Sequence, residues 1–372
     1  MKAVVHLRDA PPDLPTTLRG IVDYRKSGLS LNHIVGCPLD CGYCVRHLFS
    51  NFDMKKPHLV VGDEAAVATL VGHWAFRDHV TPVQLLNRAT DPFLPGVKDH
   101  LFSTLEALDA RGLRNPVLVI TRWHVEAEDI ARLERLSNIR LTVLVTWSGI
   151  EDQRLEPVDS AVAEGSLQRL GRLAKRTKSI LYWRPLITGI NDTDDHLERA
   201  LALADCASAT VFSGLFHRDE IRTYLRSVGM GDAYPEVARR KILPAALEAR
   251  VLAAFAGRPL FRKTSCGVGF AHETSDYNGH FGLKDVCDIC PAAQLDRCRT
   301  AHARPDFDTL RQLALACDLP LDHLNIDDRR IEVAGSSEQQ RYFIQHSLNY
   351  QVHDRAHPHH FRRHGRAEVG WT

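Results

Sequence analysis

The stretch VGCPLDCGYCVRH, residues 35–47, places three cysteines within eight positions. Cys37, Cys41 and Cys44 follow the spacing C-x3-C-x2-C. Soft thiolates select zinc, copper(I) or iron–sulfur clusters, and a structural zinc site needs four ligands. Three thiols in one loop instead suit a [4Fe–4S] cluster that keeps one iron open, although His47 offers a fourth ligand for zinc.

The remaining composition is that of a globular protein with ordinary charge. The 372 residues are 44% hydrophobic and 25% charged, with a formal net charge of +1. This length and apolar content suffice for a full core, and the near-neutral charge gives no overall field toward nucleic acid or membrane. No long apolar run follows Met1 and none reaches 18 residues, so we expect no secretory signal, no membrane span and a cytoplasmic location.

Seven of the nine cysteines fall into two groups, which favours metal or redox chemistry over disulfides in a reducing compartment. The second group comprises Cys266, Cys287, Cys290 and Cys298. Two thiolates in a C-x2-C turn bind one metal well, and four cysteines close a site. We expect a second [4Fe–4S] cluster or a zinc ion there. The side chains that offer a replacement for a missing ligand are His272, His280 and Asp288.

Segments with strand and helix patterns alternate from about residue 31 onward. We expect strands over residues 30–37, 82–92, 115–123, 139–149, 179–192 and 208–216. We expect helices over residues 63–77, 97–112, 126–138, 161–177 and 193–207. The alternation predicts parallel βαβ units in a barrel-like sheet or an open doubly wound one. Both arrangements bind ligands at the carboxyl ends of the strands, where the polar candidates fall: Cys37, residues 87–91, Arg122, Ser148, Arg184 and Ser213.

The motif C-x3-C-x-aromatic-C, with Tyr43 as the aromatic residue, resembles the radical S-adenosylmethionine (radical SAM) superfamily. TDP at 90–92, VITR at 119–122, LEP at 155–157 and RPLITGIND at 184–192 resemble its spore photoproduct lyase-like branch. The resemblance covers roughly residues 31–215. It implies a partial (β/α)6 TIM-like barrel in which a [4Fe–4S] cluster, reduced by flavodoxin or ferredoxin, cleaves S-adenosyl-L-methionine. The resulting 5′-deoxyadenosyl radical takes hydrogen from a substrate that the sequence does not identify.

The same resemblance implies contacts with S-adenosylmethionine. Members carry a Gly-Gly-Glu-like stretch after the second strand, and here it reads NRATDP, in which Asn87, Thr90 and Asp91 offer acceptors. Ser148 lies where a polar side chain contacts the ribose. Arg184 lies where a cation holds the methionine carboxylate. No residue is assigned as catalytic.

Each of these candidates also has a purely structural interpretation. Tyr43 can serve as a packed aromatic residue, and Asp91 or Ser148 as a turn residue. Arg184 can pair with a core carboxylate. These alternatives stay open at the level of sequence.

We divide the chain into four parts: an entry segment (1–30), the radical SAM partial barrel (31–235), a helical, cysteine-rich metal-binding extension (236–300) and a helical region with a basic His/Arg tail (301–372). That tail offers a metal tract, a nucleic-acid contact or a solvated end. The alternative function is a non-catalytic zinc- or iron–sulfur-stabilised protein that binds nucleic acid or a partner. Fold resemblance does not fix the substrate, so DNA repair, peptide or natural-product modification and small molecules all remain open.

Overall fold

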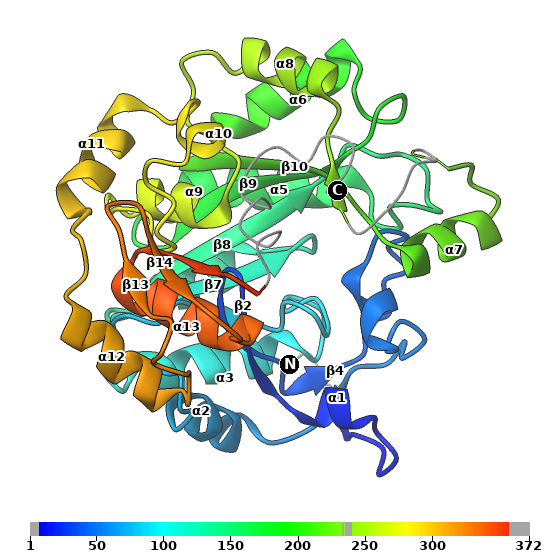
Figure 1. The fold of residues 1–372 in the computed structure, drawn as a ribbon. Coiled ribbons are helices and arrows are strands. Elements are labelled where there is room, and N and C mark those ends of the chain that lie inside the picture. The colour runs from blue at the N-terminus through cyan, green and yellow to red at the C-terminus, as the bar shows by residue number, and fades with distance from the viewer. Residues whose placement is uncertain (1–6, 233, 235–239, 357–372) are drawn as a thin grey trace.

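The structure, a computed structural model, describes residues 7–232, 234 and 240–356. At its centre six parallel strands lie side by side, and their order in space is their order along the chain (Figure 1). They are β3 (Gly28–Leu31), β6 (Val83–Leu85), β7 (Pro116–Thr121), β8 (Arg140–Trp147), β9 (Lys178–Leu186) and β10 (Ala209–His217). A helix lies in every connection between neighbours, as parallel pairing requires. The expected α/β fold with a large parallel sheet is therefore confirmed.

Three further strands border this sheet. At one end β2 (Val22–Arg25) pairs antiparallel with β3. At the other end β11 (Arg240–Ile242) pairs antiparallel and β12 (Leu260–Phe261) pairs parallel with β10. No pairing among the described residues joins the two ends, so the sheet is open.

Alternate residues of the central strands point to an outer layer of helices. In β8, Val143, Val145 and Trp147 belong to the main core that these helices share. The outer helices are α2 (Asp63–Val71), α3 (Lys98–Asp109), α4 (Ala127–Leu133), α5 (Ser160–Leu173), α6 (Asp194–Ala204) and α8 (Ala245–Ala254). Asp159 and Thr193 cap α5 and α6 with their side-chain oxygens, which fixes where those helices begin.

The intervening residues of the strands point to the opposite, inner face. Its apolar part comprises Leu118, Leu144, Ile180 and Val211, one from each of β7 to β10, and helix α9 (Thr264–Ala271) packs on it. Gly267 permits the close approach, because a Cβ at that position would lie 2.6 Å from Cγ2 of Val211. Further along the same face, toward the carboxyl ends, the strands carry polar side chains.

The first expected strand, over residues 30–37, is wrong in extent. The central strand β3 ends at Leu31, and β4 (Ile34–Val35) belongs to a separate small sheet with β1 (Arg8–Asp9) and β5 (His58–Leu59). Asn32 and His33 divide the two, because each buried side chain bonds a residue outside the central sheet, while the Asn32 amide also donates to the Ser30 hydroxyl on β3 at 2.6 Å. The Asn32 oxygen accepts from the amide of Arg88, and His33 Nε2 lies 3.0 Å from Asp63 Oδ1.

The C-terminal part of the chain comprises α10 (Lys284–Cys287), α11 (Ala292–Ala301), α12 (Phe307–Ala316), α13 (Glu338–Leu348) and a small sheet of β13 (Asn325–Ile326), β14 (Arg330–Val333) and β15 (Gln351–Asp354). Its last elements, orange and red in Figure 1, return to the blue N-terminal segment. Helix α13 packs on β2, where His346 Nδ1 lies 3.1 Å from the Tyr24 hydroxyl. The four-part division stays a prediction, and the basic tail from residue 357 lies outside the described residues.

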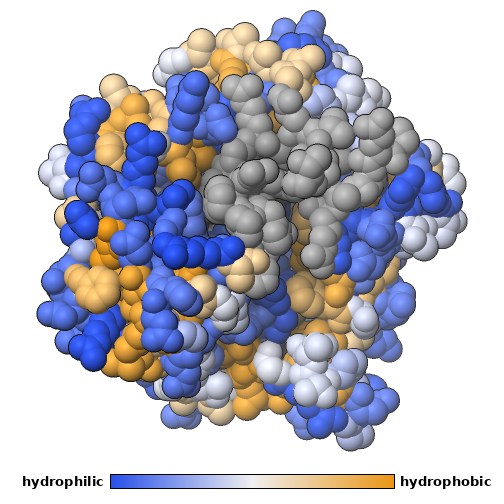
Figure 2. All heavy atoms as spheres, viewed as in Figure 1, coloured by the Kyte–Doolittle hydropathy of each residue, from blue (hydrophilic) through white to orange (hydrophobic). Residues whose placement is uncertain are grey.

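Hydrophilic side chains and smaller groups of hydrophobic ones are interspersed on the face shown in Figure 2. Among the described residues, no helix combines the length and apolarity that a membrane crossing requires.

Candidate functional site

The first three cysteines lie in a loop whose backbone is held from several sides. Gly36 precedes them with a φ of 98°, and a Cβ there would lie 2.2 Å from the carbonyl oxygen of Lys56. The amide of Cys37 donates to the carbonyl oxygen of Met54 at 2.8 Å. The buried guanidinium of Arg46 donates to three backbone carbonyl oxygens of the same loop, those of Leu39, Asn51 and Phe52.

One cavity gathers the three thiols with the carboxyl ends of β7 to β10 and the segment after β6. The residues expected from sequence that line this cavity are Cys37, Cys41, Tyr43, Cys44, Asn87, Thr90, Asp91 and Arg184. Arg122 and Ser213, placed at strand ends by the same reasoning, also line it. The topology therefore brings these residues to one place, although they are up to 176 positions apart (213 − 37).

Burial disfavours the thiolate form of the first two cysteines in the absence of a cation. Cys37 and Cys41 are buried and Cys44 is half-buried. Burial raises the pKa of Cys37 and raises that of Cys41 well above its usual range, although Arg46 and Arg122 respectively oppose the shift. A metal centre reverses this preference, because a coordinating thiol gives up its proton.

Three hydroxyl groups in the cavity wall are buried without a hydrogen-bond partner among the described residues. They belong to Thr90, Thr146 and Ser213. Buried hydroxyls nearly always have a partner, because burial without one costs about 1–3 kcal/mol. Three thiols and three buried hydroxyls without a partner, all from residues that line one cavity, therefore fit a ligand that is polar and bound to a metal.

Tyr43, which lines the cavity, is held by a buried ionic network. The Tyr43 hydroxyl donates to Glu156 Oε2 and accepts from Arg122 Nη1, while Arg122 Nη1 lies 2.7 Å from the same carboxylate oxygen. Burial alone lowers the pKa of Arg122, but neighbouring Cys41 and Glu156 outweigh it and hold this pKa well above its usual range. The guanidinium thus stays charged beside Cys41 and anchors Tyr43.

Ser148 joins this network and does not line the main cavity. Its hydroxyl donates to Glu156 Oε2 at 3.3 Å, and it lines a smaller pocket with Glu156 and Trp147. The ribose contact expected for Ser148 stays a prediction, and the contact seen for its hydroxyl is with Glu156.

Two of the expected acceptors are already occupied within the protein. The carboxylate of Asp91 accepts from the Thr121 hydroxyl at 2.7 Å and from the amides of Arg122 and Phe93 at 2.9 and 3.0 Å. The Asn87 amide accepts from Ser30 and donates to Gln84. Asp91 therefore fixes the end of β7, and Thr90 is the member of this segment with a free hydroxyl.

Arg184 faces the cavity from the end of β9. Its guanidinium carbon lies 4.0 Å from the ring centre of Tyr182, and Nη1 donates to the Tyr182 hydroxyl at 3.2 Å. The Tyr182 hydroxyl lies 3.3 Å from Oγ1 of Thr264, at the start of α9. Among the described residues no carboxylate forms an ion pair with Arg184, which leaves a cation on the cavity wall.

The second group of cysteines also converges. Cys266 lies on α9, Cys287 ends α10, Cys290 follows it and Cys298 lies on α11, so the segment that holds this group contains three short helices. The thiols of Cys266 and Cys290 are hydrogen-bonded. Cys298 Sγ accepts from the amides of Asp276 and the Gln294 side chain at 3.3 and 3.4 Å.

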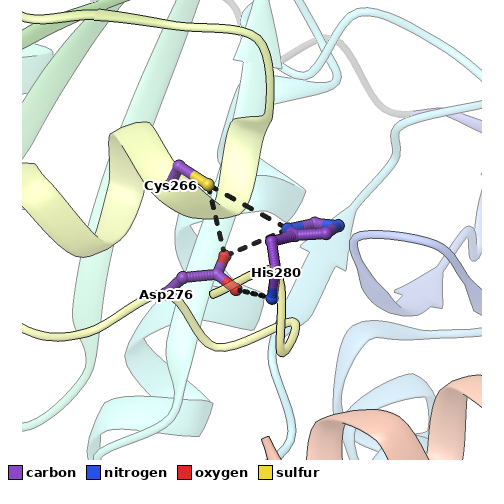
Figure 3. A group of neighbouring side chains, drawn as sticks. All are labelled: Cys266, Asp276 and His280. Carbon is purple, nitrogen blue, oxygen red and sulfur yellow. Dashed lines mark hydrogen bonds and ion pairs between the residues drawn. The ribbon is translucent and has the colours of Figure 1, made fainter. Parts of the chain in front are cut away.

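Two further metal-binding side chains face Cys266 (Figure 3). Asp276 Oδ1 lies 3.7 Å and His280 Nδ1 lies 4.0 Å from Cys266 Sγ, and the two atoms are 3.4 Å apart. All three residues are at most 4% exposed. The other two expected substitutes lie elsewhere, because His272 bonds Thr142 and Asp288 pairs with Arg262.

The sequence reasoning missed Thr146, Glu156 and Asp276 as parts of these sites. Thr146 is the last inner-face residue of β8, which a strict two-residue alternation identifies. Glu156 stands within the LEP segment, but its partners come from separate loops. No motif in the sequence links Asp276 to Cys266, because a turn of the chain brings the two side chains together.

No protein-family model matches the chain, and no curated protein matches it. Among solved structures it is similar to a variant of spore photoproduct lyase, with 12% identity and a TM-score of 0.48; the match covers 70% of this chain and 86% of that one. It is similar to the same extent to spore photoproduct lyase complexed with dinucleoside spore photoproduct. Streptococcus suis SuiB bound to S-adenosylmethionine has 11% identity and a TM-score of 0.44, over 68% of this chain and 54% of that one.

Proposed function

We propose that this chain is a radical SAM enzyme built on a partial (β/α)6 barrel. The observation that carries the proposal is the single cavity in which three thiols meet three unpartnered buried hydroxyls at the carboxyl ends of parallel strands. Cys37, Cys41 and Cys44 would hold a [4Fe–4S] cluster and leave one iron open. With S-adenosylmethionine on that iron, the pair supplies reductive cleavage of the sulfonium and hydrogen abstraction from a substrate.

The chain's own residues bind and orient the cofactor in this proposal. The Arg184 guanidinium would hold the methionine carboxylate, since it is a cation on the wall stacked against Tyr182. Thr90, Thr146 and Ser213 would donate to or accept from the polar groups of the cofactor. Tyr43, held by Arg122 and Glu156, would present its ring to the cavity.

We further propose that the thiols of Cys266, Cys287, Cys290 and Cys298 belong to a second metal centre. Their support is convergence from three helices onto buried polar partners, as described above. The electron donor would be a small redox protein such as flavodoxin or ferredoxin. The substrate is a nucleic acid, a peptide or a small molecule.

The test compares the triple variant Cys37→Ala, Cys41→Ala, Cys44→Ala with Cys206→Ala, which removes a thiol outside both groups. Each protein is purified anaerobically, and iron content and dithionite-driven cleavage of S-adenosylmethionine are measured. The triple variant should lose about four irons and all cleavage, and Cys206→Ala should keep both. Wild-type protein that holds iron but does not cleave the cofactor would support the non-catalytic alternative.

A further inference from the structure

The second cysteine group contains a compact set of three different ligand types. Cys266 Sγ, Asp276 Oδ1 and His280 Nδ1 face one another at 3.7, 4.0 and 3.4 Å, and Figure 3 shows their side chains converging from α9 and the loop that follows it. The 3.4 Å between Asp276 Oδ1 and His280 Nδ1 is longer than the about 2.7–2.9 Å of a charge-assisted N–H···O bond, and His280 Nδ1 also lies 3.2 Å from the Ser265 hydroxyl. Three buried groups that can bind a metal are thus held close together.

The separations match the edges of a tetrahedron around one zinc ion. Zinc-to-ligand distances of about 2.3 Å for sulfur and 2.0–2.2 Å for nitrogen or oxygen give edges of about 3.6 Å from sulfur and about 3.4 Å between nitrogen and oxygen. The Asp276 carboxylate is oriented for this by its other oxygen. Oδ2 accepts from the amides of Asn278 and His280 at 3.1 and 2.8 Å, which directs Oδ1 toward Cys266.

The remaining cysteines differ in what their sulfur atoms contact. The Cys290 thiol contacts that of Cys266 and donates to the carbonyl oxygen of Val286 at 3.7 Å. Cys298 accepts from the amide of Asp276 at 3.3 Å. Cys287 donates to the carbonyl oxygen of His280 at 3.5 Å. Cys287 and Cys298 therefore hold the backbone of the two non-cysteine ligands.

We propose that this segment binds a single zinc ion through four ligands of three chemical types: Cys266, Cys290, Asp276 and His280. Cys287 and Cys298 are positioning residues for Asp276 and His280. Oxygen and imidazole donors suit zinc, and a closed set of four is typical of a structural site. This inference rests on the second metal centre of the proposed function and is independent of the radical reaction.

The ion would crosslink α9, the loop after it and the segment before α11, and so hold α9 on the inner face of the sheet. That position matters for the cavity. Thr264 at the start of α9 contacts the Tyr182 hydroxyl, which in turn accepts a hydrogen bond from Arg184. Loss of zinc should therefore loosen the support of Arg184 without removing any residue from the cavity wall.

The decisive measurement is X-ray absorption at the zinc edge of anaerobically purified, full-length wild-type protein, together with zinc and iron content. We expect about one zinc per chain with about two sulfur and two nitrogen or oxygen neighbours, beside about four irons from the first cluster. A shell of four sulfurs, or about eight irons with no zinc, would overturn the proposal. This readout does not depend on any variant folding.

Matched variants locate the ligands. Asp276→Asn and His280→Gln should lose at least nine-tenths of the bound zinc, whereas Asp288→Asn and His272→Gln, from the same segment, should keep it. Cys287→Ser should retain the ion with an affinity lowered about 10–100-fold, as expected for a residue that positions a ligand. Unchanged zinc in both Asp276→Asn and His280→Gln would refute the mixed ligand set. Cleavage of S-adenosylmethionine is scored separately, so failure of the first cluster is distinguishable.

Discussion

Replacing Glu156 with glutamine should leave a buried positive charge without its partner. Arg122 Nη1 and Glu156 Oε2 are 2.7 Å apart, with side chains 15% and 5% exposed. The same carboxylate oxygen accepts from Tyr43 and Ser148, so the pair is the centre of the network behind the cavity. The substitution keeps the shape and removes only the charge.

The expected loss follows from burial. Breaking a buried ion pair by removing one partner costs about 3–5 kcal/mol, since the remaining charge is desolvated without compensation. The amide oxygen of the introduced glutamine still accepts hydrogen bonds, so we take the lower end, about 3 kcal/mol. Arg122→Met should cost a similar amount, but the double variant should cost clearly less than the sum, because no buried charge then remains.

The assay is anaerobic denaturant unfolding followed by tryptophan fluorescence. Glu106→Gln is the matched control, because Glu106 pairs with Arg132 at the same 2.7 Å but with side chains 46% and 32% exposed. We expect that control to cost no more than about 1 kcal/mol. Equal losses for Glu156→Gln and Glu106→Gln, or strict additivity in the double variant, would refute the reasoning from burial.

Two further predictions concern the backbone before the cysteine loop and the packing of α13. Gly36→Ala should lower the unfolding free energy by more than about 2 kcal/mol, because the new Cβ would meet the Lys56 carbonyl oxygen. Gly20→Ala is the control, because a Cβ at position 20 would enter open space, and it should not cause this loss. The denaturant midpoints of both variants test the prediction. Burial lowers the pKa of His346 to about 3, so between about pH 6.5 and 3 the unfolded chain binds more protons than the fold. The contribution of neutral His346 to the unfolding free energy should therefore be fully present above about pH 6.5 and should fall as the pH decreases, by up to about 1.4 kcal/mol per pH unit. His346→Gln should flatten this dependence of the unfolding free energy on pH. The same slope in the variant and the wild type would contradict the assignment.

The sequence predicts the sheet well because its signals are periodic and local. Alternating apolar runs identify six strands and five helices in the correct order, and the parallel topology then forces their carboxyl ends together. The three closely spaced cysteines and Arg184 meet at that edge for this reason. Extents fail where a polar side chain has a tertiary partner, as Asn32 does at the end of β3.

The parts of the sites that could not be predicted depend on the paths that loops take through the fold. The cofactor contact of Asp91 stays a prediction, and the sequence does not reveal that Thr121 and two amides already donate to its oxygens. Glu156 meets Arg122 only because the loop after β8 folds back under the cavity. Asp276 reaches Cys266 by the same kind of return, which no spacing rule encodes, whereas His280 is among the substitute ligands that the sequence offers.

Helix α9, which covers the inner face of the sheet, is synthesised after all six central strands. The last central strand ends at His217 and α9 begins at Thr264, so 46 residues (263 − 217) are added before the ribosome begins to supply that cover. At about 5–20 residues per second this takes about 2–9 seconds. Throughout that time the nascent sheet presents an uncovered apolar row, made of Leu118, Leu144, Ile180 and Val211. The newborn chain is therefore a candidate for chaperone protection before the proposed second metal centre can form.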